Sequence, residues 1–152
     1  MKKALSLFLC FVMLVCCVPF AFAQGGDIRI DGSYAILVAD GAGERDTEAA
    51  GKLQEYISLG FGLDLEIVTS ASANYIAVGA AASKADISDV ADNGYRILAD
   101  GENVLIAGTG VRGTIHGVYR FLEEFAGLHI YTSALTVFDN SEITVPDGTD
   151  IV

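Results

Sequence analysis

The clearest periodic pattern of apolar positions lies between residues 113 and 127. Apolar side chains recur there at the three- and four-residue spacing of a helix that buries one face. These positions are Ile115, Val118, Tyr119, Leu122 and Phe125 or Ala126. The other face would present His116, Arg120, Glu123 and Glu124. Gly127 follows at the place where a left-handed residue ends many helices, so we predict an amphipathic helix that stops there.

This helix is flanked by two apolar runs, Val104–Ala107 before it and Leu128–Tyr131 after it. Short apolar runs next to glycine are typical of buried strands. A glycine-rich turn at residues 108–113 connects the first run to the helix. The stretch therefore predicts one α/β unit, made of a strand, a tight turn, a helix and a returning strand.

A second helix is predicted from Asp46, with Asp46 as its N-cap and Glu48 in its first turn, where the helix dipole favours an acid. Gly60 and Gly62 would end this helix. Its apolar face would consist of Ala49, Ala50, Leu53, Tyr56 and Ile57.

The remaining pattern is dominated by short strands. We expect them at residues 27–30, 34–39, 63–68, 75–78, 94–99, 104–107, 129–131, 135–137 and 143–145, with the start of another after Gly148. The turn sequence Asp100–Asn103 predicts a hairpin, and a short helix is predicted over Asp86–Val90. Hairpin and crossover connections together indicate an α/β (α+β) fold, a two-layer sandwich of a mixed β-sheet with two main helices packed on it.

Residues 1–23 have the features of a signal peptide. Lys2 and Lys3 precede an apolar run, and Ala21 and Ala23 supply the small residues that a signal peptidase needs. A membrane anchor is the alternative, but the run is short for spanning and Pro19 closes it. We therefore expect export, cleavage after Ala23 and a single domain over residues 24–152, with no membrane contact after cleavage.

Composition narrows the range of partners. All three cysteines lie in the leader, so residues 24–152 contain no disulfide or thiolate metal site. Without Lys2 and Lys3, seven of the nine basic residues remain against 20 acidic ones, a net charge of about −13. Such a chain lacks the basic footprint that nucleic acids and anionic membranes require.

Gly108–Gly113 matches G-x-G-x-x-G, follows a predicted strand and opens a helix, as in dinucleotide-binding folds. The returning strand ends at Thr132 without the acid that would bind a ribose, and the first acid is Asp139. We therefore interpret these glycines as a tight strand-to-helix turn and expect no cofactor.

No residue pattern predicts a catalytic or metal site. Glu123 and Glu124 are adjacent and point about 100° apart on a helix, so they would not flank one glycosidic bond. The two histidines, His116 and His129, lack metal-ligand spacing, and no G-x-S-x-G elbow is present. Arg112 and His116 are the candidates for contact with a neighbouring domain or ligand, with an ordinary surface role as the alternative.

The central unit resembles a known family. Residues 110–114, 117–123 and 127 are similar to the segment RGxxxGVYxFLExxxG, and residues 49–57 to AAxxLQxYL. These segments belong to the N-terminal domain of glycoside hydrolases of the α-glucuronidase and β-N-acetylhexosaminidase-like type. One departure is His129-Ile130-Tyr131, where that family often has Arg-Trp-Tyr.

The resemblance implies a non-catalytic two-layer domain that precedes a catalytic barrel. A barrel takes ~250 residues, so the catalytic carboxylates would lie outside this chain, which we expect to be a fragment. Packing on such a barrel predicts an apolar patch on one face of the domain. Two alternatives stay open: a stand-alone exported module that binds glycans or a protein, and a nucleotide-binding domain based on the glycine motif.

Overall fold

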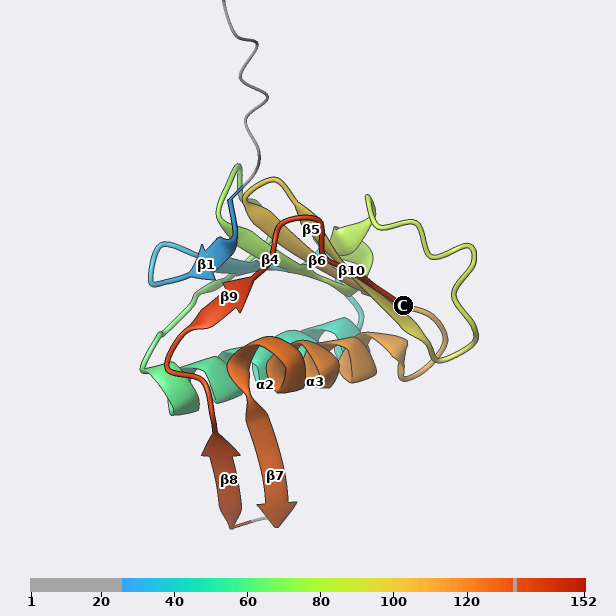
Figure 1. Cartoon of the computed structure of the whole chain (residues 1–152). Helices are drawn as coiled ribbons and strands as arrows, with labels where there is room; N and C mark the ends of the chain where they lie inside the picture. The colour runs from blue at the N-terminus through green and yellow to red at the C-terminus, as the bar shows by residue number, and fades with distance from the viewer. Residues whose placement is uncertain (1–25, 133) are drawn as a thin grey trace, which may run out of the picture.

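In the computed structural model, which describes residues 26–132 and 134–152, a six-stranded sheet carries two helices on one face (Figure 1). The strand order is β10-β5-β6-β4-β2-β3. The strands are β2 (Ala35–Leu37), β3 (Ile67–Val68), β4 (Tyr75–Val78), β5 (Tyr95–Asp100), β6 (Asn103–Gly108) and β10 (Asp150–Ile151). The helices are α2 (Glu44–Phe61) and α3 (Gly113–Ala126). This is the predicted fold class.

The sheet is mixed. Strands β3, β2, β4 and β6 run parallel to one another, whereas β5 pairs antiparallel with β6, and β10 pairs antiparallel with β5 at the edge. Strands β5 and β6 form the predicted hairpin, with Ile97 opposite Ile106 and Asp100 opposite Asn103. Gly101, in the two-residue turn, has a φ of +64°, a value that glycine adopts without strain.

Two strand pairs lie outside this sheet. Strand β1 (Ile28–Ile30) pairs antiparallel with β9 (Ile143–Val145). Strands β7 (Leu128–Thr132) and β8 (Leu135–Phe138) form a hairpin that follows α3 and projects beyond the helix layer, away from the sheet (Figure 1).

The main core lies between the sheet and the helices. Strand residues Ile36, Ile76, Val78, Ile97 and Ile106 are buried against Leu53 and Ile57 of α2 and Val118, Phe121 and Leu122 of α3. A smaller cluster of Ala77, Leu105 and Ala107 covers the other face, beneath the 3-10 helix η1 (Gly79–Ala82). Burial on both faces explains the uninterrupted apolar runs of β4 and β6.

The buried face of α3 differs from the predicted stripe. Phe121 and Gly117 are fully inside, whereas Ile115 and Tyr119 are only half-buried. A Cβ atom at Gly117 would lie 2.8 Å from Ile106 Cγ2, so the missing side chain lets α3 approach the sheet and turns Phe121 into the core. Tyr119 points instead toward α2, where its ring centroid is 5.9 Å from that of Tyr56.

The start of α2 also differs from the prediction. The helix begins at Glu44 with Gly43 as its N-cap, so Asp46 lies within the first turn. Gly62 ends the helix in the left-handed conformation, as predicted, but Gly60 lies inside it. A Cβ atom at Gly60 would come within 2.7 Å of the Phe138 ring of β8, which packs on this turn.

Two shorter predictions are wrong. Residues 86–90 form no helix: the Asp86 carboxylate accepts a hydrogen bond from the Ser88 N–H at 2.9 Å and stabilises a turn. The short helix of this region is η1 instead. In 63–68 only Ile67–Val68 forms a strand, since the Leu65 carbonyl accepts a hydrogen bond from the Gln54 side chain rather than from a neighbouring strand.

The edge strand β10 is held by an ion pair. Arg96 Nε and Nη2 each lie 2.7 Å from a carboxylate oxygen of Asp150, and Arg96 Nη1 donates to the Asp86 carbonyl at 2.8 Å. Asp89 lies 3.3 Å from the same guanidinium. The hydrogen bonds from Arg96 lower the pKa of Asp150 below its ordinary value.

The predicted leader, residues 1–23, and its cleavage site after Ala23 lie outside the described residues. Within residues 26–132 and 134–152, no helix combines the length and the hydropathy needed to cross a membrane.

Candidate functional site

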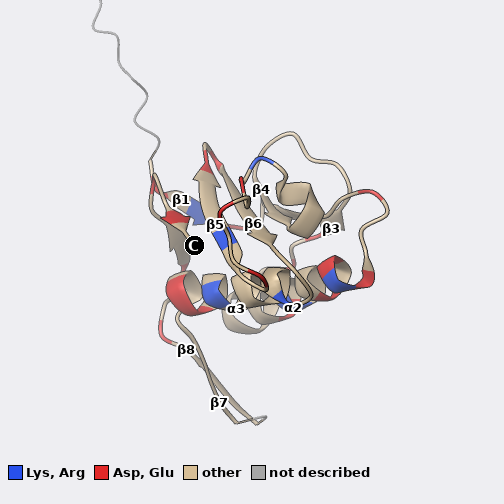
Figure 2. Cartoon of the chain, turned by 90° about the vertical axis from the view of Figure 1, so that its right-hand side faces the viewer, with Lys and Arg blue, Asp and Glu red and all other residues tan. Residues whose placement is uncertain are grey.

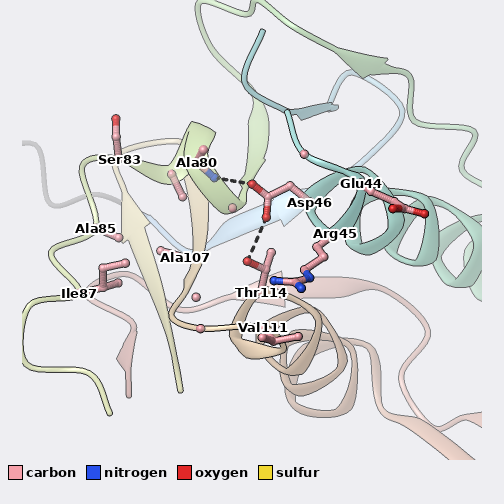
Figure 3. A pocket seen from close by; sticks show the side chains of 15 residues that line it. Glu44, Arg45, Asp46, Ala80, Ser83, Ala85, Ile87, Ala107, Val111 and Thr114 are labelled. Carbon is pink, nitrogen blue, oxygen red and sulfur yellow. Dashed lines mark hydrogen bonds between the residues drawn. The ribbon is translucent and has the colours of Figure 1, made fainter. Parts of the chain in front are cut away.

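A cleft of about 770 Å³ lies at the carboxyl ends of β4 and β6, beside the first turns of α2 and α3 (Figure 3). Ligands of open α/β sheets usually bind outside the carboxyl ends of the strands, which makes this cleft the first place to look for function. Small and apolar residues form much of its wall, with Asp46 and Thr114 among the polar ones. The lining residues include Gly43, Arg45, Gly79, Ala80, Ala82, Ser83, Ala85, Ile87, Ala107 and Val111.

Asp46 joins three elements across this cleft. Its Oδ2 accepts a hydrogen bond from the Ala80 N–H at 3.0 Å, and its Oδ1 accepts one from the Thr114 hydroxyl at 3.1 Å (Figure 3). Gly79, with a φ of +63°, makes room for the carboxylate, because a Cβ atom there would lie 2.1 to 2.3 Å from its atoms. The carboxylate therefore connects α2, η1 and α3 as a structural bridge.

The glycines of the G-x-G-x-x-G pattern serve close packing at this turn. A Cβ atom at Gly108 would lie 1.9 Å from the Thr114 nitrogen, and one at Gly113 would lie 2.1 Å from the Gly94 carbonyl oxygen. Gly110 has a φ of +61°. The interpretation of these glycines as a tight strand-to-helix turn is confirmed by these contacts.

Two N–H groups in the turn just before α3 are bound by a protein side chain. Asn93 Oδ1 accepts hydrogen bonds from the backbone N–H groups of Val111 and Arg112, both at 3.0 Å. Asn93 adopts a φ of +60°, which asparagine tolerates better than most residues. In a dinucleotide site, N–H groups at this position would bind the pyrophosphate. Here an amide oxygen of the chain itself occupies that position.

The two predicted contact residues, Arg112 and His116, lie together at the exposed start of α3. Both are attached to Asn93: the Arg112 N–H donates to its side chain, and His116 Nδ1 lies 3.3 Å from its carbonyl oxygen. Arg112 also lines a small cleft of about 270 Å³ with Arg45 and Glu48. Their contact with another domain or a ligand stays a prediction.

The carboxylates of this cleft differ in what they contact. Glycoside hydrolysis requires an acid and a second carboxylate that are both available to a substrate. Two carboxylates line this cleft: Glu44 is exposed, and the half-buried Asp46 uses one oxygen on a backbone N–H and the other on a hydroxyl. Among the described residues, no group of three His, Cys, Asp or Glu side chains is placed to hold a metal ion. The arrangement is suited to holding α2, η1 and α3 together.

A second surface feature is the β7–β8 hairpin, which is apolar and exposed. Leu128–Phe138 contains no Lys, Arg, Asp or Glu, and Figure 2 shows both strands without charged colour, whereas the helices and several loops carry acids. Its exposed large apolar side chains are Ile130 (48% exposed), Tyr131 (67%), Leu135 (51%) and Val137 (37%). These side chains expose apolar surface on the hairpin, and its docking on a partner stays a prediction.

The base of this hairpin is firmly attached to the domain. Phe138 packs edge-on against Phe61 of α2 with ring centroids 5.6 Å apart, and Leu128 is buried. Asn140 donates a hydrogen bond to the Phe125 carbonyl at 2.9 Å, near the end of α3. The apolar side chains beyond this base therefore project from a fixed position.

Sequence reasoning missed the roles of Asp46 and Asn93. Both act on partners far away along the chain: Asp46 reaches Thr114, and Asn93 reaches Val111 and Arg112. The dipeptide Asn93-Gly94 is a turn signal that would have placed Asn93 in a loop, though without its partners. Nothing in the local sequence indicated that the hairpin would be exposed, because apolar and polar residues alternate along its strands as they do in half-buried strands.

Comparison with known proteins identifies one matching family model and solved structures with a similar fold. Residues 21–126 match the family model described as glycosyl hydrolase family 20, domain 2. The solved GH20 β-N-acetylhexosaminidase from Streptomyces coelicolor A3(2) is similar in fold, with a TM-score of 0.59 and 19% identity over 84% of this chain. This chain covers 23% of that enzyme, about a quarter of its length.

A second solved structure gives a weaker match. It is described as a GH138 enzyme targeting pectin rhamnogalacturonan II, and it matches with a TM-score of 0.46 and 16% identity over 70% of this chain and 11% of its own. No curated protein sequence matches this chain.

Proposed function

We propose that this chain, which belongs to glycosyl hydrolase family 20, domain 2, is the non-catalytic accessory domain of an exported carbohydrate-active enzyme. In this role it packs against a catalytic barrel and stabilises it, while the carboxylates that cleave the glycosidic bond belong to the barrel. The match of the family model over residues 21–126 is the observation that carries the proposal.

The chemistry of the cleft supports an accessory role. Asp46 and Asn93, which would be the natural ligand-binding groups at this edge of the sheet, both bind other parts of the same chain. A domain whose polar groups are satisfied internally is suited to giving mechanical support, because it holds its shape without a ligand.

The surface supports a packing role as well. The hairpin and the exposed Leu59 of α2 leave large apolar side chains in water on a chain that is otherwise rich in acids. Burial of such surface is the main favourable contribution to association between domains. Arg112 and His116 are exposed at the other end of α3, away from the hairpin, and would supply separate polar contacts with a neighbouring domain or a ligand.

The enzyme is proposed to be of the hexosaminidase type and to act outside the cytoplasm. Family 20 supports the hexosaminidase side of the motif resemblance, and neither comparison supports the α-glucuronidase side. The export follows from the leader at residues 1–23, whose charged start, apolar run and small residues before position 24 fit a signal peptide.

The test is the size of the native product, measured by immunoblot of the producing cells and their medium with an antibody against residues 24–152. We expect a band several times larger than 16.0 kDa, in the medium or cell envelope, with hexosaminidase activity in the same immunoprecipitate. A band near 13–14 kDa, from 129 residues at ~110 Da each, would contradict the accessory role. It would favour a stand-alone binding module.

A further inference from the structure

Residues 86–90 lie beside the large cleft, and Ile87 forms part of its wall (Figure 3). The segment lies between η1 and β5 and contains neither helix nor strand. Ile87 and Val90 are half-buried, and the other side chains of the segment are exposed. A segment that buries so little apolar surface opens locally at a lower free energy than the core does.

Both flanks of this segment are fixed to the body of the domain. Ala85, just before it, is buried, and its N–H donates to the Ala82 carbonyl at 3.0 Å. Ala91, just after it, accepts a hydrogen bond from the Thr109 hydroxyl of the turn before α3. The part of the loop that can move by itself is therefore residues 86–90.

One side chain, Arg96 of β5, holds this part in place. Its Nη1 donates to the Asp86 carbonyl at 2.8 Å and lies 3.3 Å from a carboxylate oxygen of Asp89. The other edge of the same guanidinium, Nε and Nη2, is bound by Asp150 of β10. Because the guanidinium is planar and its donors are fixed relative to one another, Asp150 orients the donor that holds the loop.

We propose that residues 86–90 form a lid on the cleft, that Arg96 holds this lid closed, and that strand β10 determines how firmly Arg96 holds it. When β10 detaches, Asp150 leaves the guanidinium, and the lid opens more often. Opening removes Ile87 from the wall of the cleft. All parts of the device belong to this chain, so the proposal does not depend on the accessory role.

Strand β10 is suited to this role because it is short and lies at an edge. It consists of Asp150 and Ile151 and pairs with one neighbour, β5. Such a strand detaches at a lower free energy than the central strands. The side chain of Arg96 is only 20% exposed, so its pair with Asp150 is less screened by salt and water than an open surface pair. Loss of this pair should therefore have a measurable effect on the lid.

The released guanidinium has a competing partner in Asp89. Turning fully toward this carboxylate would hold the lid more tightly instead of releasing it. The side chain of Asp89 is 65% exposed, and an ion pair at such a position contributes little to stability. We therefore expect opening, and the two outcomes differ in sign.

Amide hydrogen exchange, followed by NMR on the product expressed from the full 152-residue sequence, tests the proposal. Two backbone hydrogen bonds serve as reporters. The Val90 N–H donates to the Ile87 carbonyl at 3.2 Å and reports on the lid. The Ala99 N–H donates to the Thr149 carbonyl at 2.9 Å and reports on the attachment of β10.

Asp150→Asn should accelerate exchange at Val90 and Ala99 about tenfold, because it weakens hydrogen bonds between charged groups. Asp147→Asn is the matched control: it makes the same change in the loop before β10 and should leave both rates at the parental value. The amide of Ile106, in the central strand β6, should keep its rate in both variants, which separates local opening from global unfolding.

The coupling must also act in the opposite direction. Asp86→Ala removes the acceptor of the Ser88 N–H and loosens the lid, so exchange at Ala99 should accelerate. Arg96→Lys should accelerate exchange at Val90, because an ammonium group lacks the fork that binds β10 and the lid together.

Four results would overturn the proposal. They are unchanged or slower exchange at Val90 in Asp150→Asn or Arg96→Lys, equal effects of Asp150→Asn and Asp147→Asn, parental exchange at Ala99 in Asp86→Ala, and an equal acceleration at Ile106.

Discussion

The carboxylate of Asp46 occupies the space that a side chain at Gly79 would need. The two residues are 33 positions apart, and a Cβ atom at Gly79 would lie 2.1 Å from Asp46 Cγ. Their contact lets the first turn of α2 reach the Ala80 N–H and the Thr114 hydroxyl. The turn after β4 and the starts of both helices therefore depend on one another.

Gly79→Ala should destabilise the domain by about 3 kcal/mol, since it combines a left-handed alanine with displacement of the Asp46 carboxylate. Gly62→Ala is the control, because Gly62 has a similar φ of +66° but open space around its Cα. It should cost about 1 kcal/mol. Urea unfolding measures both, and equal losses would show that the contact with Asp46 contributes nothing.

Asp46→Ala should cost about 2 kcal/mol through the loss of two hydrogen bonds to a carboxylate. A double-mutant cycle with Thr114→Val should give a coupling energy of about 1 kcal/mol, since the two side chains bond directly. Pairing Thr114→Val with Glu55→Ala, an exposed acid further along the same helix, should give none. Additive losses for Asp46 and Thr114 would contradict the bridge.

Acid should weaken the domain partly through Asp150. Arg96 lowers the pKa of Asp150 in the folded state, so this carboxyl contributes stability above its unfolded pKa of about 3.9. That stability is lost as the pH falls through the folded pKa. Asp150→Asn should therefore lower the melting temperature at pH 7 and flatten its decline toward pH 3. Asp147→Asn, in the loop before β10, should keep the parental profile.

Replacing glycine by alanine should have opposite effects on stability at two positions, Gly108 and Gly51, because the space around them differs. Gly108→Ala would place a Cβ atom 1.9 Å from the backbone nitrogen of Thr114, which has no room to shift, and should cost 3 kcal/mol or more, roughly the size of a severe core defect. Gly51→Ala, in the middle of α2 with no atom within 4 Å, should stabilise by about 0.5–1 kcal/mol. Thermal unfolding separates the two, and a destabilising Gly51→Ala would contradict the open space.

Sequence patterns correctly predict the elements that are determined by residues close together in the chain. The Asp100–Asn103 turn and the apolar runs around it are sufficient for the β5–β6 hairpin, and Gly62 and Gly127 end their helices by their own conformational freedom. The prediction for α2 is correct apart from Gly60, which lies inside the helix, and the first turn, where Asp46 resembles an N-cap by residue type. The actual partners of Asp46 are 34 and 68 residues away, beyond the reach of any local rule.

The errors in the predicted elements have the same cause: the contacts that decide these positions join residues far apart in the sequence. The alternation in 63–68 predicts a strand, but a strand also needs a neighbour, and only Ile67 and Val68 pair with β2. Phe121 falls outside the predicted stripe because that stripe is centred on Ile115 and Tyr119, whereas Gly117 decides which side of α3 approaches the sheet. Packing between elements, rather than the propensity of each, determines these positions.

The amide of Asn93 has a consequence for searches of genomes by short pattern. The hexapeptide at 108–113 fulfils the rule for a nucleotide site and also follows a strand and opens a helix, so neither the letters nor the local context would reject it. The discriminating residue lies 15 positions upstream of Gly108, where a side-chain oxygen already accepts the hydrogen bonds that a phosphate would accept. A match to this pattern therefore leaves open which group binds the N–H groups of the turn, and only the partners of those groups answer that question.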